Sequence, residues 1–256
     1  MKPSVPQAPP HEFRRVYVWE LPVRFYHWIN ALCILVLAAT GLIIAHPPAF
    51  VQASEASFSY WFGTVRFVHF VTAYVFVFNF AVRIYWGFVG NRYADWKNFL
   101  PLRRAQFREA ADVMRVDVLQ SRNTPVHAVG HNAVAYFTYF AMFLVFLFQV
   151  FSGFAMYSAM STSWFPKLFA WITPLFGDEY ALRQWHYAAT WFFLIFTIIH
   201  VYLVFYHDYV EGHGVMSSMV GGWKFVDARV DEAGRPADGK SWFSGRRRVP
   251  PPENPS

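Results

Sequence analysis

The chain has 256 residues, of which 55% are hydrophobic, 21% aromatic and only 15% charged, and it carries a formal net charge of +6 at pH 7. Four apolar runs approach or exceed the roughly 20 residues that a helix needs to cross a bilayer. The polar sequence between these runs is too short for a large soluble domain, so the composition predicts a multi-pass membrane protein. Its basic residues are concentrated in particular loops, a pattern that serves orientation in a membrane and does not indicate nucleic-acid binding.

The predicted fold class is all-α: an integral membrane bundle of four transmembrane helices, in a single domain over residues 16–211. Residues 1–15 are Pro-rich and polar and lack the apolar core of a secretory signal peptide, so we expect a disordered N-terminal tail. Residues 212–256 are rich in Gly, Arg and Pro and are expected to form a polar C-terminal cytoplasmic tail. The four spans are predicted at about residues 28–45, 64–87, 131–151 and 186–207.

Two boundaries and one connection carry further signals. The first span is expected to end at His46, because two prolines follow and proline cannot continue a helix. The third is expected to end at Ser152 and Gly153. In the connection over residues 90–130, apolar residues recur at i, i+4, i+7 and i+11, which favours an amphipathic helix on the membrane surface; an ordinary helix in a soluble loop fits equally well. The residues of this stripe are Phe107, Ala111, Met114 and Val118.

The distribution of Lys and Arg predicts the orientation in the membrane. The segment before the first span has four of these residues, the second loop seven and the C-terminal tail seven, against none in the first loop and two in the third. Basic loops stay on the cytoplasmic side of a membrane. Both termini and the second loop are therefore predicted to be cytoplasmic.

Two histidines in the fourth span, His186 and His200, lie fourteen residues apart. At 3.6 residues per turn and 1.5 Å per residue, this spacing places both imidazoles on nearly one helix face, roughly 21 Å apart along the axis. With the predicted orientation, His69 in the second span lies at the depth of His186, and His27 in the first lies at the depth of His200. We call His69 and His186 the outer pair, and His27 and His200 the inner pair. Ionisable groups inside a span are costly, so the pairs indicate a function, although a hydrogen-bonded core histidine is an alternative for each residue alone.

Two imidazoles at each of two depths are the axial ligands that two haems in a helix bundle require, one pair on each iron. Cys33 is the only cysteine, so the chain has neither a Cys-x-x-Cys-His for covalent attachment nor a cysteine set for an iron–sulfur cluster. The predicted cofactors are therefore two haems b. Gly41, fourteen residues after His27, is expected to leave space where the outer macrocycle would pass.

Three of the spans open with the pattern Arg-x-x-His followed by an aromatic residue. An arginine one turn outside a ligand, on the same helix face, could bind a haem propionate at the membrane surface. Snorkelling of cations at helix ends is the alternative, although it does not explain the fixed offset from histidine. Arg83, fourteen residues after His69, reaches the depth of the inner pair. The propionate candidates are Arg24, Arg66, Arg83 and Arg183.

These motifs resemble those of a known family. Over residues 17–210, the chain is similar to the b-type cytochrome subunit of membrane-bound nickel–iron hydrogenases, and in outline to the gamma subunits of formate dehydrogenases. The resemblance rests on Arg-Phe-Tyr-His-Trp at the first span, Arg-x-x-His at the second, Gly-His-Asn before the third and His-x13-His in the fourth. It implies ligand roles for the four paired histidines and makes His131 and Asn132 candidates for contact with a quinone. Asn132-Ala133-Val134 departs from the family pattern, in which a proline is common.

The resemblance further implies a function. Such a subunit anchors the small and large subunits of a nickel–iron hydrogenase on the periplasmic side of the bacterial inner membrane and passes their electrons to the quinone pool of the respiratory chain. The chain itself contains no hydrogenase active site, so it would be the electron-transfer part of a hydrogen:quinone oxidoreductase. A gamma subunit of formate dehydrogenase, or of a related quinone-linked oxidoreductase, is the alternative.

A transporter or proton channel is a further alternative, because intramembrane histidines and arginines also line polar pathways. Transporters more often show spans broken by Gly or Pro around a site at the membrane midplane. Here the paired histidines lie near the two surfaces and no span is interrupted by proline. The pattern therefore favours the cytochrome.

Overall fold

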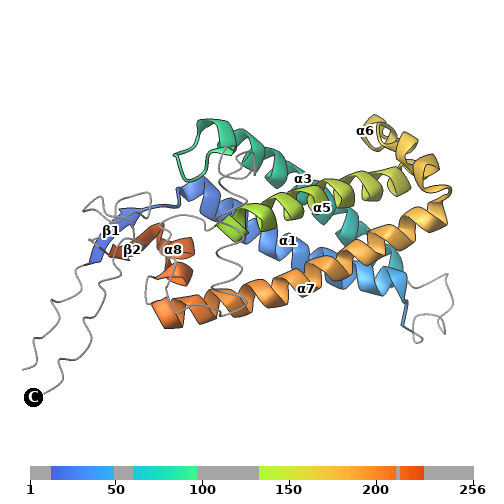
Figure 1. The fold of residues 1–256 in the computed structure, drawn as a ribbon. Coiled ribbons are helices and arrows are strands. Elements are labelled where there is room, and N and C mark those ends of the chain that lie inside the picture. The colour runs from blue at the N-terminus through green and yellow to red at the C-terminus, as the bar shows by residue number, and fades with distance from the viewer. Residues whose placement is uncertain (1–12, 49–59, 97–132, 212–213, 228–256) are drawn as a thin grey trace, which may run out of the picture.

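A computed structural model describes residues 13–48, 60–96, 133–211 and 214–227. Four long helices dominate it (Figure 1). Each is long and apolar enough to cross a membrane, and only 6% to 28% of the residues in their most apolar stretches are buried inside the protein. These outward apolar faces suit lipid, so the structure has four candidate membrane-spanning helices, the number predicted from the sequence. The helices are α1 (Leu21–Ala45), α3 (Trp61–Val89), α5 (Ala133–Ser158) and α7 (Glu179–Glu211).

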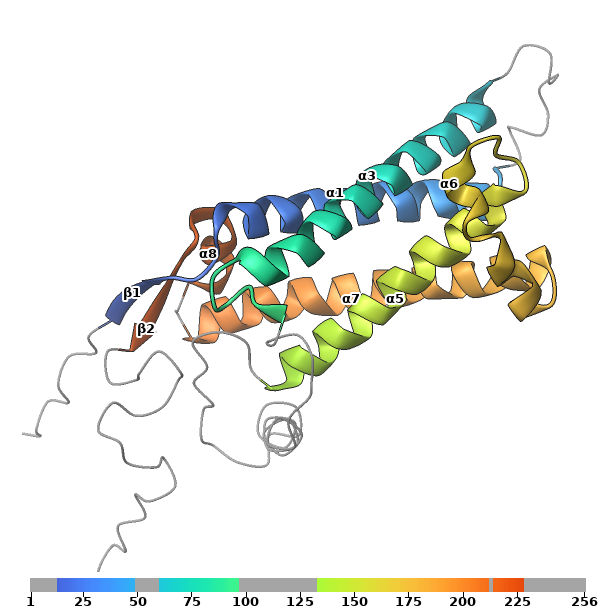
Figure 2. The same cartoon turned by 90° about the horizontal axis from the view of Figure 1, so that it is seen from above.

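The bundle consists of two neighbouring helix pairs. Helix α1 packs along α3, α5 packs along α7, and α1 also contacts α7 (Figure 2). All four contribute to one apolar core, which contains two stacked contacts of the Phe146 ring, at 4.8 Å from Phe76 and 5.5 Å from Phe80. Phe193 meets Phe146 edge-on and lies seven residues from both His186 and His200 on α7. The core therefore lies about halfway in depth between the outer and inner pairs. Its buried members are Cys33, Phe76, Phe80, Met142, Phe146 and Phe193.

The end of the bundle that carries the outer pair is covered by short helical elements. Helix α6 (Trp164–Lys167) and the 3-10 helix η3 (Ala170–Phe176) pack against α5, and η3 also packs against α7. Ile172 of η3 is buried against Ala155 and Leu182. This small apolar cluster fixes the beginning of α7, and with it the depth of His186.

The opposite end is closed by an antiparallel pair of short strands. Strand β1 (Phe13–Tyr17) pairs with β2 (Trp223–Asp227), which follows helix α8 (Val215–Gly221). Gly222 makes the turn between α8 and β2 with φ of +85°, and a Cβ there would lie 2.6 Å from the Tyr17 ring. Residues 13–15 and 214–227, which we expected to belong to polar tails, thus form an ordered cap across the start of α1.

Several helix boundaries differ from the prediction. Helix α7 begins at Glu179, seven residues before the expected start at residue 186, and ends at Glu211 instead of residue 207. Helix α1 begins at Leu21, seven residues earlier than expected, because Pro22 in its first turn is compatible with a helix start. Helix α5 does not stop at Ser152 and Gly153 but continues to Ser158. The glycine leaves room for a contact that is described below. The predicted amphipathic stripe at residues 107–118 lies outside the described residues.

Candidate functional site

The inner pair consists of two imidazoles that approach each other across two helices. The ring centroids of His27 on α1 and His200 on α7 are 6.3 Å apart, with an angle of 52° between the ring planes. An imidazole nitrogen binds a first-row metal at about 2.0–2.1 Å, so adding roughly 1.1 Å from nitrogen to ring centre on each side gives a centroid separation of about 6.2–6.4 Å. The observed separation therefore fits one iron between the two rings.

Several buried polar atoms around the inner pair lack a protein partner. Among the described residues, Arg24 Nε, His27 Nδ1 and Asn30 Oδ1 on α1 have no hydrogen bond, and the one other such buried side-chain atom is Gln149 Oε1 on α5. The three residues on α1 follow one another at intervals of three, so they lie along one side of that helix. Unsatisfied buried polar atoms are rare in folded proteins and destabilising. Their concentration beside His27 fits a site that receives a bound group.

Neighbouring side chains fix the inner pair in the bundle. Asn79 on α3 is only 6% exposed, and its Nδ2 donates to the Tyr26 carbonyl at 3.0 Å. This bond holds α3 against α1 one residue before His27. On the other side, the Phe196 ring stacks on His200 with centroids 5.5 Å apart.

The outer pair is held by side-chain hydroxyls. His69 on α3 lies with its Nδ1 at 2.8 Å from Thr40 Oγ1 on α1. His186 on α7 has its Nδ1 at 2.8 Å from Ser152 Oγ on α5. Each outer histidine is thus fixed by a neighbouring helix, His69 by α1 and His186 by α5.

A glycine follows each of these hydroxyl residues. A Cβ on Gly41 would lie 3.4 Å from Cε1 of His69, and a Cβ on Gly153 would lie 3.3 Å from Cε1 of His186. We expected Gly41 to make room for a macrocycle, but its neighbour is the imidazole itself. Thr40, Ser152 and Gly153 were not predicted from the sequence to contact these histidines. The available signal was a Thr-Gly or Ser-Gly dipeptide inside an apolar span.

The four candidate propionate ligands lie at the two ends of the bundle and contact protein groups. At the outer end, Arg66 Nη2 is 3.2 Å from the sulfur of Met160, and Arg183 forms an exposed ion pair with Glu179 at 3.1 Å. At the inner end, Arg24 donates to the carbonyl of Val220 in α8. Both terminal nitrogens of Arg83 donate to the Ala94 carbonyl at 3.3 Å.

The two quinone candidates, His131 and Asn132, lie outside the described residues. Within the described parts of the chain, no group of three or more His, Cys, Asp or Glu comes together.

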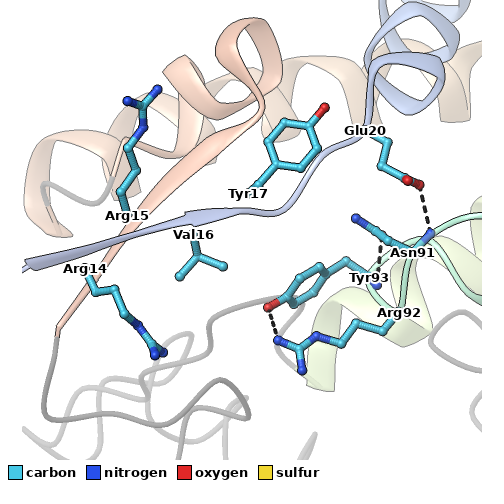
Figure 3. Close-up of a pocket in the computed structure, with 8 residues that line it drawn as sticks. All are labelled: Arg14, Arg15, Val16, Tyr17, Glu20, Asn91, Arg92 and Tyr93. Carbon is cyan, nitrogen blue, oxygen red and sulfur yellow. Dashed lines mark hydrogen bonds between the residues drawn. The ribbon is translucent and has the colours of Figure 1, made fainter.

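A surface pocket lies near the start of α1 (Figure 3), and none of its lining residues belongs to either histidine pair. It is lined by residues of β1 and of the segment after α3, where the Glu20 carboxylate accepts hydrogen bonds from the Asn91 backbone at 2.8 Å and from Trp86 Nε1 at 2.9 Å. Asn91 Nδ2 in turn donates to the Val18 carbonyl at 3.1 Å. These bonds join the beginning of α1 to the end of α3, so we interpret this region as a structural joint.

Comparison with protein families gives one match over most of the chain. The family model described as "Prokaryotic cytochrome b561" matches residues 18–222. This range includes all four long helices, both histidine pairs and α8.

Similar proteins carry names that refer to hydrogenases. A "Probable Ni/Fe-hydrogenase B-type cytochrome subunit" of Cupriavidus necator is 39% identical over 215 residues, which cover 82% of this chain and 87% of that protein. A protein of the same name from Azotobacter vinelandii is 38% identical, over 84% of this chain and 91% of the relative. The "Probable Ni/Fe-hydrogenase 1 B-type cytochrome subunit" of Escherichia coli is 33% identical, over 81% and 90%. The resemblance predicted from the motifs is thereby confirmed.

Proposed function

Because this chain belongs to the prokaryotic cytochrome b561 family, we propose that it is a dihaem cytochrome b subunit that anchors a periplasmic nickel–iron hydrogenase and passes its electrons to the membrane quinone pool. Family membership implies b-type haem in a multi-pass membrane protein. The names of the relatives support the association with a hydrogenase. The number of haems, the periplasmic side and the quinone are parts of the proposal.

The observation that carries the proposal is the geometry of the inner pair. Two imidazoles from different helices, 6.3 Å apart between centroids, fit a single iron with two axial histidines. In the proposal, His27 and His200 ligate the inner haem, and His69 and His186 the outer haem. Haem bound at these two places would supply two one-electron carriers.

The remaining candidate residues receive roles according to their position. Arg66 and Arg183 at the outer end, and Arg24 and Arg83 at the inner end, are proposed to neutralise haem propionates. Guanidinium groups suit this role because they bind carboxylates in a bidentate way and remain charged. His131 and Asn132 are proposed to contact the quinone.

The proposed direction runs from the outer to the inner pair. The hydrogenase small and large subunits would dock at the outer, periplasmic face, and the quinone would be reduced at the inner, cytoplasmic face of the bacterial inner membrane. Two carriers divide the ~30 Å hydrocarbon core into shorter steps. The aromatic core around Phe146 and Phe193 lies between them. A quinone reduced at the inner face would take its protons from the cytoplasm, so the reaction would contribute to the membrane potential.

The test combines purification with spectroscopy. The full-length protein, purified in mild detergent, should contain two b-type haems per chain, and a nickel–iron hydrogenase pair should purify with it. Hydrogen should reduce both haems and then an added quinone. A molybdenum or tungsten formate dehydrogenase as the partner would transfer the assignment to that enzyme. A colourless protein would contradict the cytochrome function and return the transporter as the leading hypothesis.

A further inference from the structure

We propose that two dipeptides, Thr40-Gly41 and Ser152-Gly153, act as seats that orient the outer pair of histidines for iron. In each seat, the hydroxyl fixes the tautomer of a histidine from a neighbouring helix, and the glycine admits the edge of its ring. The inference rests on the proposed haem ligation and identifies Thr40 and Ser152 as positioning residues. We call each of these two dipeptides a hydroxyl–glycine seat.

The tautomer of His69 follows from the proton of the Thr40 hydroxyl. A threonine hydroxyl has one proton to donate and two lone pairs to accept. Thr40 Oγ1 lies 2.6 Å from the carbonyl oxygen of Val36, which can only accept, so the proton is directed to that carbonyl. The contact of 2.8 Å between Thr40 Oγ1 and His69 Nδ1 must then be donated by the imidazole. His69 therefore carries its proton on Nδ1 and keeps the lone pair of Nε2 for a metal.

The same argument holds for the second seat. Ser152 Oγ lies 2.6 Å from the carbonyl oxygen of Phe148, one turn earlier in α5. The His186 Nδ1 atom, at 2.8 Å, then donates to the serine oxygen. The Nε2 lone pair of His186 is left available as well. Metal-bound histidines usually donate their other ring N–H in this manner, which fixes both tautomer and ring orientation.

The glycines complete each seat. A Cβ at Gly153 would be in tight contact with the imidazole of His186, 3.3 Å from its Cε1, and a Cβ at Gly41 would be in van der Waals contact with Cε1 of His69 at 3.4 Å. Glycine in the middle of a helix is destabilising relative to alanine, so its presence beside both outer histidines calls for a local reason. Close approach of the imidazole supplies that reason in both seats.

Ordinary helix packing does not account for this arrangement. A serine or threonine within a helix commonly bonds only the carbonyl of its own preceding turn, as Thr64 and Ser158 do. Thr40 and Ser152 make that bond and additionally accept from a histidine of another helix. The arrangement occurs twice, in unrelated parts of the chain, and both times at a histidine of the outer pair.

The seats have two expected consequences. Donation from Nδ1 makes an imidazole more basic and strengthens its bond to the metal, so loss of a seat hydroxyl should weaken haem binding at the outer site about 10- to 100-fold. A more basic axial ligand also favours the ferric state. Removal of the hydroxyl should therefore raise the reduction potential of the outer haem.

The experiment uses the full-length chain with Thr40→Val or Ser152→Ala. Matched controls are Thr64→Val and Ser158→Ala, which remove a hydroxyl whose one hydrogen bond among the described residues goes to a carbonyl three or four positions earlier in the chain. The measurements are haem content during titration of the haem-depleted protein with haem, and a spectroscopic redox titration of both haems. We expect lower affinity and a higher potential at the outer haem in the two test variants, an unchanged inner haem, and unchanged values in the controls. Thr40→Ser should restore the original behaviour, because it returns the hydroxyl.

The outcomes separate this inference from the proposed function. If the unsubstituted protein holds two haems but Thr40→Val and Ser152→Ala behave like the controls, the seats are packing features and the inference is wrong. If the unsubstituted protein lacks a haem at the outer pair, the ligand assignment fails and the inference fails with it. Ser152 is fully buried, so where Ser152→Ala does not accumulate, the half-buried Thr40 decides the question through Thr40→Val and Thr40→Ser.

Discussion

The outer and inner histidine pairs are constructed in different ways, although spacing along the chain makes them look equivalent. Both outer imidazoles donate to hydroxyls of adjacent helices, whereas the buried His27 Nδ1 has no hydrogen bond among the described residues. The inner pair is instead held through the backbone, by the bond from Asn79 to the Tyr26 carbonyl. A hydrogen bond at Nδ1 fixes the tautomer and the orientation of an imidazole ring before a metal binds. Where Nδ1 has no such bond, the ring takes its orientation from the group that binds to it. We therefore expect the outer site to be the more preorganised of the two.

The largest expected effect comes from removing a ligand. His69→Ala or His186→Ala should remove only the outer haem, and His27→Ala or His200→Ala only the inner one, because each pair serves one iron. Haem content should fall from two per chain to one in every variant. In membranes supplied with hydrogen, the His200→Ala variant should still show reduction of the outer haem while quinone reduction stops.

Two results would contradict this assignment. If loss of His27 and loss of His69 depleted the same haem, the pairing by depth would be wrong. If quinone reduction continued in the His200→Ala variant, the quinone would react at the outer haem and the charge-separating direction would fail.

A substitution in a hydroxyl–glycine seat tests the comparison more finely. Gly153→Val places a branched side chain at a position whose Cβ would already lie 3.3 Å from the His186 ring. Overpacking of a well-filled interior costs about 1–3 kcal/mol, and here it should displace a ligand. We expect the outer haem content to fall while the inner haem remains.

The matched control is Gly63→Ala in α3, because nothing lies within 4 Å of a Cβ at that position. It should leave both haems bound and stabilise the helix by about 1 kcal/mol. Equal loss of both haems in Gly153→Val would show that the whole bundle is disturbed and would remove the distinction between the two sites.

Much of this architecture follows from local sequence patterns. Hydropathy predicted four spans because lipid-facing helices need apolar residues over their whole length. His27 and His200 lie close to each other, which agrees with the common depth predicted for them. In a regular helix, the number of residues between two side chains sets their separation along the axis. Such properties depend only on residues within one helix and on the thickness of the bilayer.

The remaining features depend on contacts between distant segments. Thr40 meets His69 across 29 positions and Ser152 meets His186 across 34, and no local pattern specifies which helices become neighbours. Strands β1 and β2 pair although they lie at opposite ends of the chain. Gly153 was interpreted as a helix end, because the sequence alone does not show that a ring from another helix occupies the space beside it.

A smaller effect is expected from the backbone contact at the inner pair. Asn79→Ala removes the donor to the Tyr26 carbonyl in a buried position. Loss of a buried hydrogen-bond partner costs about 1–3 kcal/mol, so the unfolding temperature should fall. The spectrum of the inner haem should change more than that of the outer haem. Thr197→Val, which removes a hydroxyl that donates to the Phe193 carbonyl of its own helix, is the control and should affect neither spectrum.

The smallest predicted effect concerns the outer arginines, and it distinguishes propionate binding from snorkelling. Arg66 contacts a weak acceptor, the sulfur of Met160, at 3.2 Å and lies 6.0 Å from the centroid of the Phe70 ring, whereas Arg183 is already engaged in an exposed ion pair of the kind that contributes about 0–1 kcal/mol. None of these contacts is strong enough to prevent these side chains from turning to a propionate.

Arg66→Leu or Arg183→Leu should leave the outer haem bound but lower its reduction potential, because removal of a nearby positive charge makes the ferric state easier to hold. A tenfold change in the preference for one oxidation state corresponds to about 59 mV for a single electron, and we expect a shift of this size or less. Lys167→Leu, at the same end of the bundle but outside the Arg-x-x-His pattern, should leave the potential unchanged. If all three variants gave the same redox titration as the unsubstituted protein, the arginines would only snorkel to the membrane surface. The difference between the two sites would then lie in the hydroxyls around the outer histidines alone.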